Sequence, residues 1–407
     1  MQGDKACPSC GQLIPIGHDE CPHCTKPHGW HLVERETLLL ASIVGLVILF
    51  GITGVAASLY HAGRQSLAQE WFARGELDLK NKNPDGALDD FHTALSYSPD
   101  SALYRLRLAQ ALVAMGRTDE ARSHLLTLWR DEPGNSTVNL ELARLAARRN
   151  DSSDALLYFH NAIYGVWPSN AAQHRLDTRW ELCEYLLSQH QKAQAQSELI
   201  ALQAEIPENA ALYTKIAGMF RQAGDRNRAL SAYRQALEID KRHGDALTGA
   251  GETAFAMGEY QVAADYLQRA VRVGAASKAD ADLLSTARLV LNLDPLAPRL
   301  SRAEADRRTL RDFEFATTRL GECLQSRGIA PPQEQEEPQD ELGKLSLQAD
   351  KLKSSAKSSA LLRDPDLRVT LMDFVSTVEE TTTRVCGTPG GVDLALLLIA
   401  RKQGTAD

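Results

Sequence analysis

Four cysteines near the N-terminus have the spacing of metal ligands. They form two Cys-x-x-Cys pairs, Cys7 with Cys10 and Cys21 with Cys24. Each pair can present two thiolates to one ion, and two pairs complete the tetrahedron of four sulfurs that a structural Zn²⁺ prefers. The sequence therefore predicts a structural zinc site made by these four residues. Because so short a segment has little core, the ion would supply roughly 10 kcal/mol or more of its folding free energy.

The residues around the cysteines are typical of a small metal-binding module. Pro follows the first Cys of each pair, and Gly11 follows the first pair, where such a turn often needs a left-handed residue. On these features residues 1–29 resemble the short zinc ribbon at the N-termini of bacterial membrane proteins, although Thr25 replaces the expected second Gly. Two disulfides, or a redox pair, remain alternatives, but a redox pair would need a βαβ pattern that is absent. The nearby histidines are expected to be bystanders: His18, His23, His28 and His31.

A long uncharged stretch follows the cysteines. Residues 37–60 contain no Asp, Glu, Lys or Arg, and at about 1.5 Å per residue they can cross a hydrocarbon core of about 30 Å. Trp30 and Tyr60 flank the stretch at interfacial positions. A buried core helix is the alternative, but the stretch has no polar face. A cleavable signal peptide is a second alternative, although both the leader and the apolar segment are too long for one. We interpret the stretch as a single uncleaved transmembrane helix.

The orientation of this helix is not set by its flanking charges, because Lys and Arg are similarly frequent on both sides. Thiols offered to zinc persist in a reducing cytosol and tend to oxidise outside it. This favours a cytoplasmic N-terminus and, in a bacterium, a repeat region in the periplasm, with the helix in the inner membrane. Small residues such as Ala41, Gly45 and Gly54 could let two such helices approach, which raises the hypothesis of a homodimer.

Beyond the span the sequence repeats every 34 residues. The first unit, which begins at Ala68, carries Trp71, Gly75, Ala87, Phe91, Ala94 and Pro99 at positions 4, 8, 20, 24, 27 and 32. This spacing resembles the tetratricopeptide repeat, a pair of antiparallel helices. Six units fill residues 68–277, with a six-residue insertion before the fourth. All six have Ala at position 20, namely Ala87, Ala121, Ala155, Ala195, Ala229 and Ala263. The resemblance implies an all-α superhelix with a concave inner face that binds other proteins or peptides.

The resemblance also implies which residues line the inner face. The candidates for partner binding come from the first helix of each unit: Phe72, Arg144, Arg148, Trp180, Arg221 and Phe255. No single charge dominates these positions, and the Asn and Lys set that clamps chaperone tails is absent. A solvated groove wall is the alternative for any one of them. Trp180 and Phe255 are predicted to be exposed aromatic anchors for a peptide.

The C-terminal third is predicted to be helical as well. Residues 278–328 are expected to cap the array, residues 329–340 have the Pro, Gln and Glu content of a solvated linker, and residues 341–407 form a helical tail. The tail is predicted to contain helices at 341–362, 365–385 and 393–401, the last of which is too short to span a bilayer. Cys183 is expected to be a buried packing residue. Cys323 and Cys386 each end a predicted helix, and they either form a disulfide or remain free thiols.

Charge and motif content narrow the function. The net charge of −8 argues against a nucleic-acid groove, and no phosphate loop, His-Glu-x-x-His helix or nucleophile elbow occurs. The sequence therefore predicts a protein that is not an enzyme. It favours a single-pass membrane-anchored scaffold whose repeats recruit or organise partner proteins. The alternative is a transmembrane sensor that couples occupancy of the groove or of the metal site to a cytosolic partner.

Overall fold

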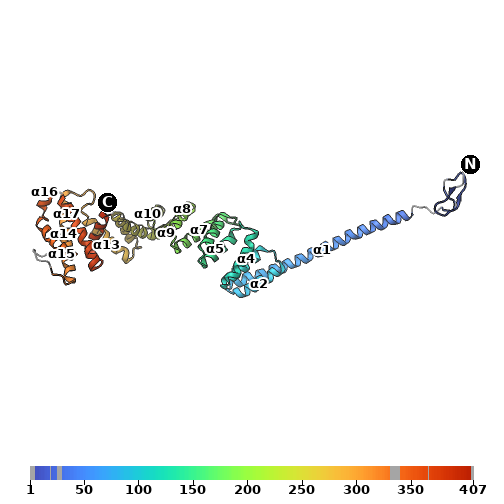
Figure 1. Ribbon diagram of the computed structural model, residues 1–407, viewed down its shortest axis with the longest axis horizontal. Coiled ribbons are helices and arrows are strands. Elements are labelled where there is room, and N and C mark those ends of the chain that lie inside the picture. The colour runs from blue at the N-terminus through green and yellow to red at the C-terminus, as the bar shows by residue number, and fades with distance from the viewer. Residues whose placement is uncertain (1–4, 19, 25–29, 331–339, 365, 405–407) are drawn as a thin grey trace. The chain divides into compact units, whose positions relative to one another are not determined.

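The computed structural model describes residues 5–18, 20–24, 30–330, 340–364 and 366–404, without the side chains of 30–35 and 403–404. Part of the predicted zinc ribbon therefore lies outside the described residues. The side chain of Trp30 and most of the predicted linker also lie outside them. The chain divides into two compact units, residues 1–133 and 134–407, which are described separately. Their helices can be followed by colour in Figure 1.

Within its described residues, the compact unit 1–133 contains a short hairpin and four helices. The antiparallel strands pair Lys5 with Ile14 and Ala6 with Leu13. The bounds are β1 Lys5–Ala6, β2 Leu13–Ile14, α1 Trp30–Lys80, α2 Pro84–Tyr97, α3 Ala102–Ala114 and α4 Thr118–Asp131.

The second unit is helical throughout its described part. Its bounds are α5 Ser136–Arg148, α6 Ser152–Tyr164, α7 Ala171–Ser188, α8 Lys192–Glu205, α9 Ala210–Gln222, α10 Arg226–Ile239, α11 Gly244–Ala256, α12 Tyr260–Val273, α13 Lys278–Leu293, α14 Arg302–Ser326, α15 Glu341–Ser355, α16 Ser358–Arg363, α17 Asp366–Cys386 and α18 Gly391–Gly404.

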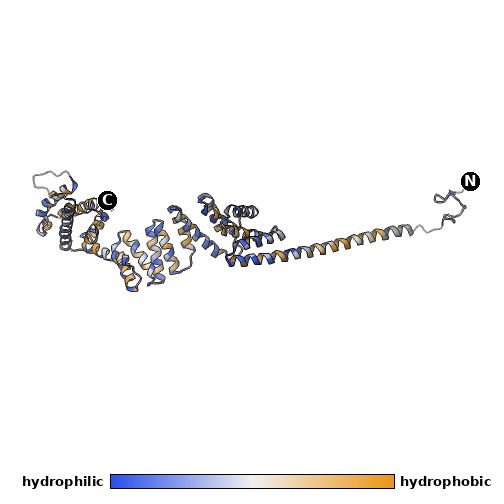
Figure 2. Cartoon of the chain, turned by 90° about the horizontal axis from the view of Figure 1, so that it is seen from below, coloured by the Kyte–Doolittle hydropathy of each residue, from blue (hydrophilic) through white to orange (hydrophobic). Residues whose placement is uncertain are grey.

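Helix α1 joins two elements that the sequence predicted as separate. It runs for 51 residues without a break, so the predicted span and the first helix of the first repeat unit are one helix (Figure 1). No proline lies between Tyr60 and Lys80, and an isolated Gly63 costs a helix only about 1 kcal/mol. The apolar part continues directly into the amphipathic part, as the hydropathy colouring of Figure 2 shows.

The repeat units fold as helical hairpins that close on small residues. The alanine at position 20 is fully buried in all six units. Position 8 is Gly75 in the first unit and Gly251 in the last, and a Cβ built there would lie 2.6 Å from Phe91 or Leu267 of the partner helix. Only glycine or another small residue at position 8 allows this approach. The predicted all-α repeat architecture is therefore confirmed at the level of packing.

The six-residue insertion before the fourth unit lengthens a helix. Helix α7 has 18 residues, whereas the first helices of the third, fifth and sixth units have 13. The Trp167 ring, which is buried, stacks on His174 of the added turn with ring centroids 4.7 Å apart. The insertion therefore adds a packed helical turn within the second unit.

The predicted cap and tail share one hydrophobic core. Buried side chains of α13, α14, α15, α16, α17 and α18 form a single cluster with residues of α12. Phe313 of α14 and Phe374 of α17 lie at its centre, with ring centroids 5.3 Å apart. The predicted single helix at 341–362 is wrong, because α15 ends at Ser355 and α16 begins at Ser358. Helix α18 is buried through Leu396 and Ile399, which fits its prediction as a docked helix.

Candidate functional site

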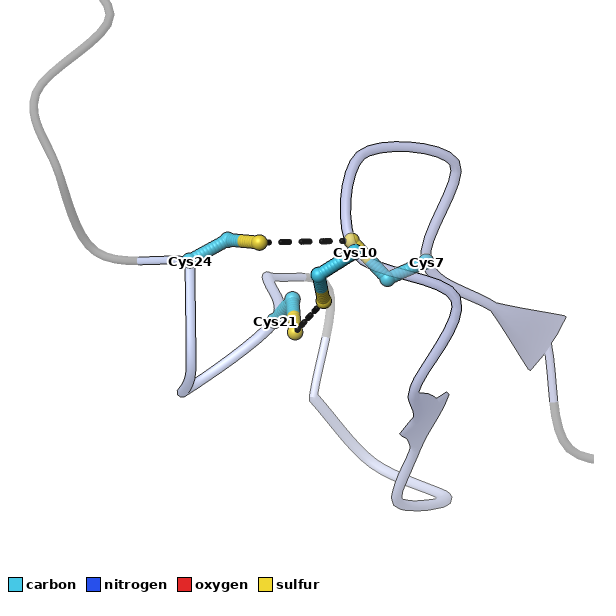
Figure 3. A group of neighbouring side chains, drawn as sticks. All are labelled: Cys7, Cys10, Cys21 and Cys24. Atoms are coloured by element: carbon cyan, nitrogen blue, oxygen red, sulfur yellow. Dashed lines mark hydrogen bonds between the residues drawn. The ribbon is translucent and has the colours of Figure 1, made fainter.

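The four N-terminal cysteines form a compact cluster at the β1–β2 hairpin. All four Sγ atoms lie within 4.8 Å of one another. The Sγ atoms of Cys7 and Cys24 lie 3.7 Å apart, and so do the Sγ atoms of Cys10 and Cys21 (Figure 3). A tetrahedral zinc with Zn–S bonds of about 2.3 Å would separate its sulfurs by about 3.8 Å. The residues present therefore fit a tetrahedral metal ion with four thiolate ligands.

Backbone hydrogen bonds hold these cysteines in place. Gly11 adopts a φ of +73°, as the sequence predicted for this turn, and its N–H donates to the carbonyl of Cys7. Cys7 in turn donates its N–H to the carbonyl of Gln12, and Cys24 donates to that of Cys21. These bonds fix both turns with their side chains facing one another.

The cluster favours a bound cation electrostatically. The backbone N–H groups of Ser9 and Cys10 lower the pKa of the Cys7 thiol to about 7. The pKa of Cys24 is raised, because Cys10 and then Cys7 hydrogen bond to its protonated form. Four thiolates this close together would repel one another. A divalent cation would offset that repulsion.

The apolar part of helix α1 presents a surface that no other described residue covers. Every residue from Glu36 to Gly63 is exposed, including Phe50 at 74%. Within the described residues it is the one single helix long and apolar enough to cross a membrane. Helices α17 and α18, bent by 119°, pass the same test together, but most of their apolar side chains are buried in the C-terminal core. Burial therefore distinguishes α1 from these core helices.

The first helices of neighbouring hairpins are joined by ion pairs. Within each of the two compact units, we call the side formed by these first helices the inner face. In three of the four pairs, a residue at position 9 of one hairpin meets a residue of opposite charge at position 6 of the next. Within residues 1–133 the pair is Glu76–Arg107 at 2.9 Å. Within residues 134–407 the pairs are Arg144–Glu181 at 2.9 Å, Glu184–Lys215 at 2.9 Å and Arg221–Glu252.

These ion pairs neutralise the inner face more than they stabilise the fold. Their side chains are about a third to a half exposed, and exposed pairs contribute about 0.2–1 kcal/mol each. The sequence shows mixed charge on this face but does not by itself show which charges pair. Comparing positions 9 and 6 across adjacent units would have found it.

Comparison with known proteins identifies the hairpins. Two family models match the chain, at residues 78–138 and 214–281, and both describe the tetratricopeptide repeat. The chain contains tetratricopeptide repeats. Such repeats are protein-interaction scaffolds, and the all-α fold predicted from the sequence is of this kind.

Individual known proteins are similar to part of this chain. The chain is 31% identical over 117 residues to the TPR repeat-containing thioredoxin TTL4 of Arabidopsis thaliana, a match that spans 29% of this chain and 17% of that protein. A structure of pilF from Pseudomonas aeruginosa is 16% identical, covering 53% of this chain and 95% of its own, with a TM-score of 0.38. A structure of PilW, a type IV pilus biogenesis factor, is 18% identical, covering 54% of this chain and 97% of its own, with a TM-score of 0.37.

The aromatic residues predicted to line the groove are more covered than expected. Trp180 is 9% exposed, because Lys215 of the next tetratricopeptide repeat lies over its ring, 4.3 Å from the ring centroid. Phe72 is half-buried and stacks on Tyr104 of the next repeat. Phe255 is half-buried against the C-terminal core. The prediction that Trp180 and Phe255 are exposed anchors is therefore wrong as to exposure, since contacts between neighbouring elements cover both rings.

The predicted arginines of the inner face lie at its surface. Arg144 pairs with Glu181 and, at 3.3 Å, with Glu141 of its own helix. Arg221 pairs with Glu252 of the next repeat. Arg148 is exposed, and the described residues offer it no ion pair. Arg148 therefore retains its charge for a partner without first breaking an internal pair.

The remaining cysteines occupy two environments. Cys323 and Cys386 form a disulfide with Cα atoms 5.9 Å apart, which is one of the two alternatives left open by the sequence. It ties the end of α14 to the end of α17 across 63 residues. Cys183 is fully buried, as predicted, and burial raises the pKa of its thiol to about 12. Cys183 is therefore an inert packing residue.

Two carboxyl groups in the C-terminal core were not singled out by the sequence. Asp312 is fully buried, and neither of its carboxyl oxygens has a hydrogen-bond partner in the described part of the chain. Burial raises its pKa to about 8. Burial likewise raises the pKa of Glu379 to about 8, although Arg319 lies 3.1 Å away and partly opposes the shift. The amphipathic pattern gives both helices a core face but does not show which acidic residue falls on it.

Proposed function

We propose that this protein is a single-pass membrane-anchored scaffold whose tetratricopeptide repeats recruit partner proteins. The observation that carries the proposal is the form of α1. An uncharged apolar segment, exposed at every residue in the isolated chain, continues without a hinge into the first helix of the first repeat. Such a surface is favourable in lipid and costly in water.

Membrane attachment can be tested by placing charge in α1. The full chain is expected to stay in the membrane fraction after an alkaline carbonate wash. The double variant Leu46→Arg and Leu49→Arg should leave it, because each arginine near the bilayer centre costs about 2.5–3.5 kcal/mol on insertion scales. Leu46→Ala with Leu49→Ala is the matched control and should remain attached. Release of the unaltered chain by carbonate would contradict the proposal.

The cysteine cluster is proposed to hold a structural zinc ion. The tetrahedral fit of the four sulfurs supports a metal ion, and an all-thiolate donor set favours zinc over harder cations. Cys7, Cys10, Cys21 and Cys24 would be the ligands. Bound zinc would supply folding energy to the hairpin, and the four thiolates would hold it in a closed shell without a position for substrate.

The two groups of cysteines support a proposal for orientation. The N-terminal group is suited to metal only while its thiols are reduced, whereas Cys323 and Cys386 form a disulfide. Reduced metal sites are typical of the cytosol and structural disulfides of exported regions. We therefore propose a cytoplasmic N-terminus, an inner-membrane span and a periplasmic repeat domain.

This orientation predicts the outcome of a reporter experiment. Alkaline phosphatase, which is active only outside the cytosol, should be active when fused to the C-terminus and inactive when fused to the N-terminus. Green fluorescent protein exported in unfolded form should show the reverse. The opposite pair of results would exclude the orientation while leaving membrane attachment intact.

Partner recruitment is proposed to use the inner face. Arg148 is the first residue to test, because it is exposed and has no ion pair among the described residues. Arg148→Ala should reduce the yield of partners recovered from solubilised membranes without unfolding the repeats. Arg234→Ala, an equally exposed arginine on the second helix of a repeat, is the control. Equal recovery with both variants would show that Arg148 does not recruit.

A further inference from the structure

One end of the first unit lies close to the apolar part of α1. Helix α2 runs antiparallel to α1, and its C-terminal end returns toward the predicted span. Arg64 of α1 donates a hydrogen bond from Nη2 to the carbonyl of Ser96, at 2.7 Å. Arg105 of α3 donates to the carbonyl of Pro99 in the loop between α2 and α3, at 2.9 Å. We call this end, with Arg64, Leu67, Pro99, Leu103 and Arg105, the basal surface.

The continuity of α1 sets the height of the basal surface. Arg64 follows Tyr60 by four residues, which is about 6 Å along a helix. Each headgroup layer of a bilayer is about 5–7 Å thick. Residues 37–60 rise about 36 Å, so they fit a hydrocarbon core of about 30 Å when the helix is tilted. Because no break separates Tyr60 from Arg64, Arg64 then lies at headgroup level. The hydrogen bond from Arg64 to Ser96 brings the end of α2 to the same level.

The side chains on the basal surface suit an interface of this kind. Leu67 and Leu103 are 43% and 49% exposed, so two apolar groups face outward there. Arg64 and Arg105 supply cationic groups, and Asp100 in the same exposed loop offsets part of their charge. Both arginines also lie at the C-terminal end of α2, where cations are favourable in any environment. Exposed leucines beside them have no such structural role.

We propose that the basal surface rests on the lipid headgroups of the membrane that α1 crosses. The inference depends on the proposed span at residues 37–60. The surface combines exposed leucines with two arginines and one aspartate, so its small net positive charge fits a zwitterionic lipid surface and does not require anionic lipid. The first repeat would then be held against the bilayer, at a fixed angle to the span, with no flexible linker between them.

The opposite end of the same helices provides a matched control. Leu77 of α1 is 58% exposed, comparable to Leu103. It follows Tyr60 by 17 residues, which places it about 25 Å farther along the helix axis. A probe at position 77 therefore has similar exposure to water but no access to lipid if the geometry holds.

The test is site-specific photocrosslinking in the full chain. Benzoylphenylalanine is placed singly at positions 46, 77, 99 and 103, each variant is reconstituted in phosphatidylcholine vesicles, and lipid adducts are measured by mass spectrometry. Position 46 reports on the span. Position 99 lies in an exposed loop, so it reports on the basal surface even if a bulky group at 103 disturbs α3.

Adducts at 46, 99 and 103, with none at 77, are expected. Adducts at 46 alone would overturn the basal-surface proposal and leave the span in place. Absence of adducts at 46 would overturn the span and with it this inference. Equal adducts at 77 and 103 would show that lipid contact does not depend on height along α1, and this too would overturn the proposal.

Discussion

Sulfur is used differently at the two ends of this chain. In the N-terminal hairpin, Cys7 is the one buried residue among those described before α1, so a metal ion would have to replace a core. In the C-terminal region, the disulfide joins two helices that already share a core of two dozen buried residues. A ligand set therefore contributes most to stability where the fewest residues are buried.

The largest effect is expected from removing the metal. A chelator, or Cys21→Ser, should abolish the one metal ion expected per chain and unfold the hairpin, because the little burial among the described residues before α1 does not offset the chain entropy. Metal content by mass spectrometry and proteolysis of residues before α1 measure this. Cys183→Ala removes a thiol outside the cluster and should leave metal content unchanged. A chain with Cys21→Ser that still binds one metal ion would refute the ligand assignment.

Removing the disulfide should have a smaller effect. For a loop of 63 residues the chain-entropy relation gives about 4 kcal/mol. The double variant Cys323→Ala with Cys386→Ala should therefore weaken α14 and α17 against urea without unfolding them, because their core remains. Hydrogen exchange of these two helices gives the free energy. Complete loss of protection would mean that the disulfide, like the proposed metal ion, replaces a core.

Acidic pH should stabilise the same C-terminal core. Folded Asp312 keeps its proton up to a pKa of about 8, whereas an unfolded aspartate loses it near 4. The folded state therefore binds more protons between these values, and stability falls as pH rises, by up to about 1.4 kcal/mol per pH unit for one such group. Burial of Glu379 adds to the slope.

A neutral substitution isolates the contribution of Asp312. Asp312→Asn should flatten part of the decline between pH 5 and 8 and make the variant more stable than the unaltered chain at pH 8. Asp373→Asn, on an exposed position of α17, should leave the slope as it is. Unfolding by urea at several pH values measures both. An unchanged slope in the Asp312 variant would show that its carboxyl group is solvated.

Much of the fold could be predicted because the residues that pack each hairpin together lie within one repeat. Ala155 or Ala229 at position 20, and Gly75 or Gly251 at position 8, are required by helix contacts inside one hairpin. The exposure of Trp180 was not predictable in this way, because Lys215 covers it from the following repeat. The break between α15 and α16 lies among contacts with α14 and α17, which a single-helix pattern does not contain.

The four cysteines could be predicted for a related reason, since their spacing alone brings two pairs of ligands to one hairpin. The raised pKa values of Asp312 and Glu379 could not be predicted, because they depend on burial by helices distant in sequence. Packing within one repeat can thus be predicted from the sequence. Constraints between repeats, or within the C-terminal core, require the structure.

The smallest effect is expected at the inner face, where neither a core nor sulfur is involved. Arg144 and Glu181 belong to successive repeats and are 39% and 35% exposed. A double-mutant cycle with Arg144→Ala and Glu181→Ala should give a coupling of about 0.2–1 kcal/mol, because solvent screens the pair. The same cycle for Arg144 with Glu184, which pairs with Lys215, should give a smaller coupling. A coupling for Arg144 and Glu181 as large as the disulfide contribution would place the inner face among the elements that hold the fold together. A small coupling would leave Arg144 and Glu181 available to exchange each other for charged groups of a bound protein.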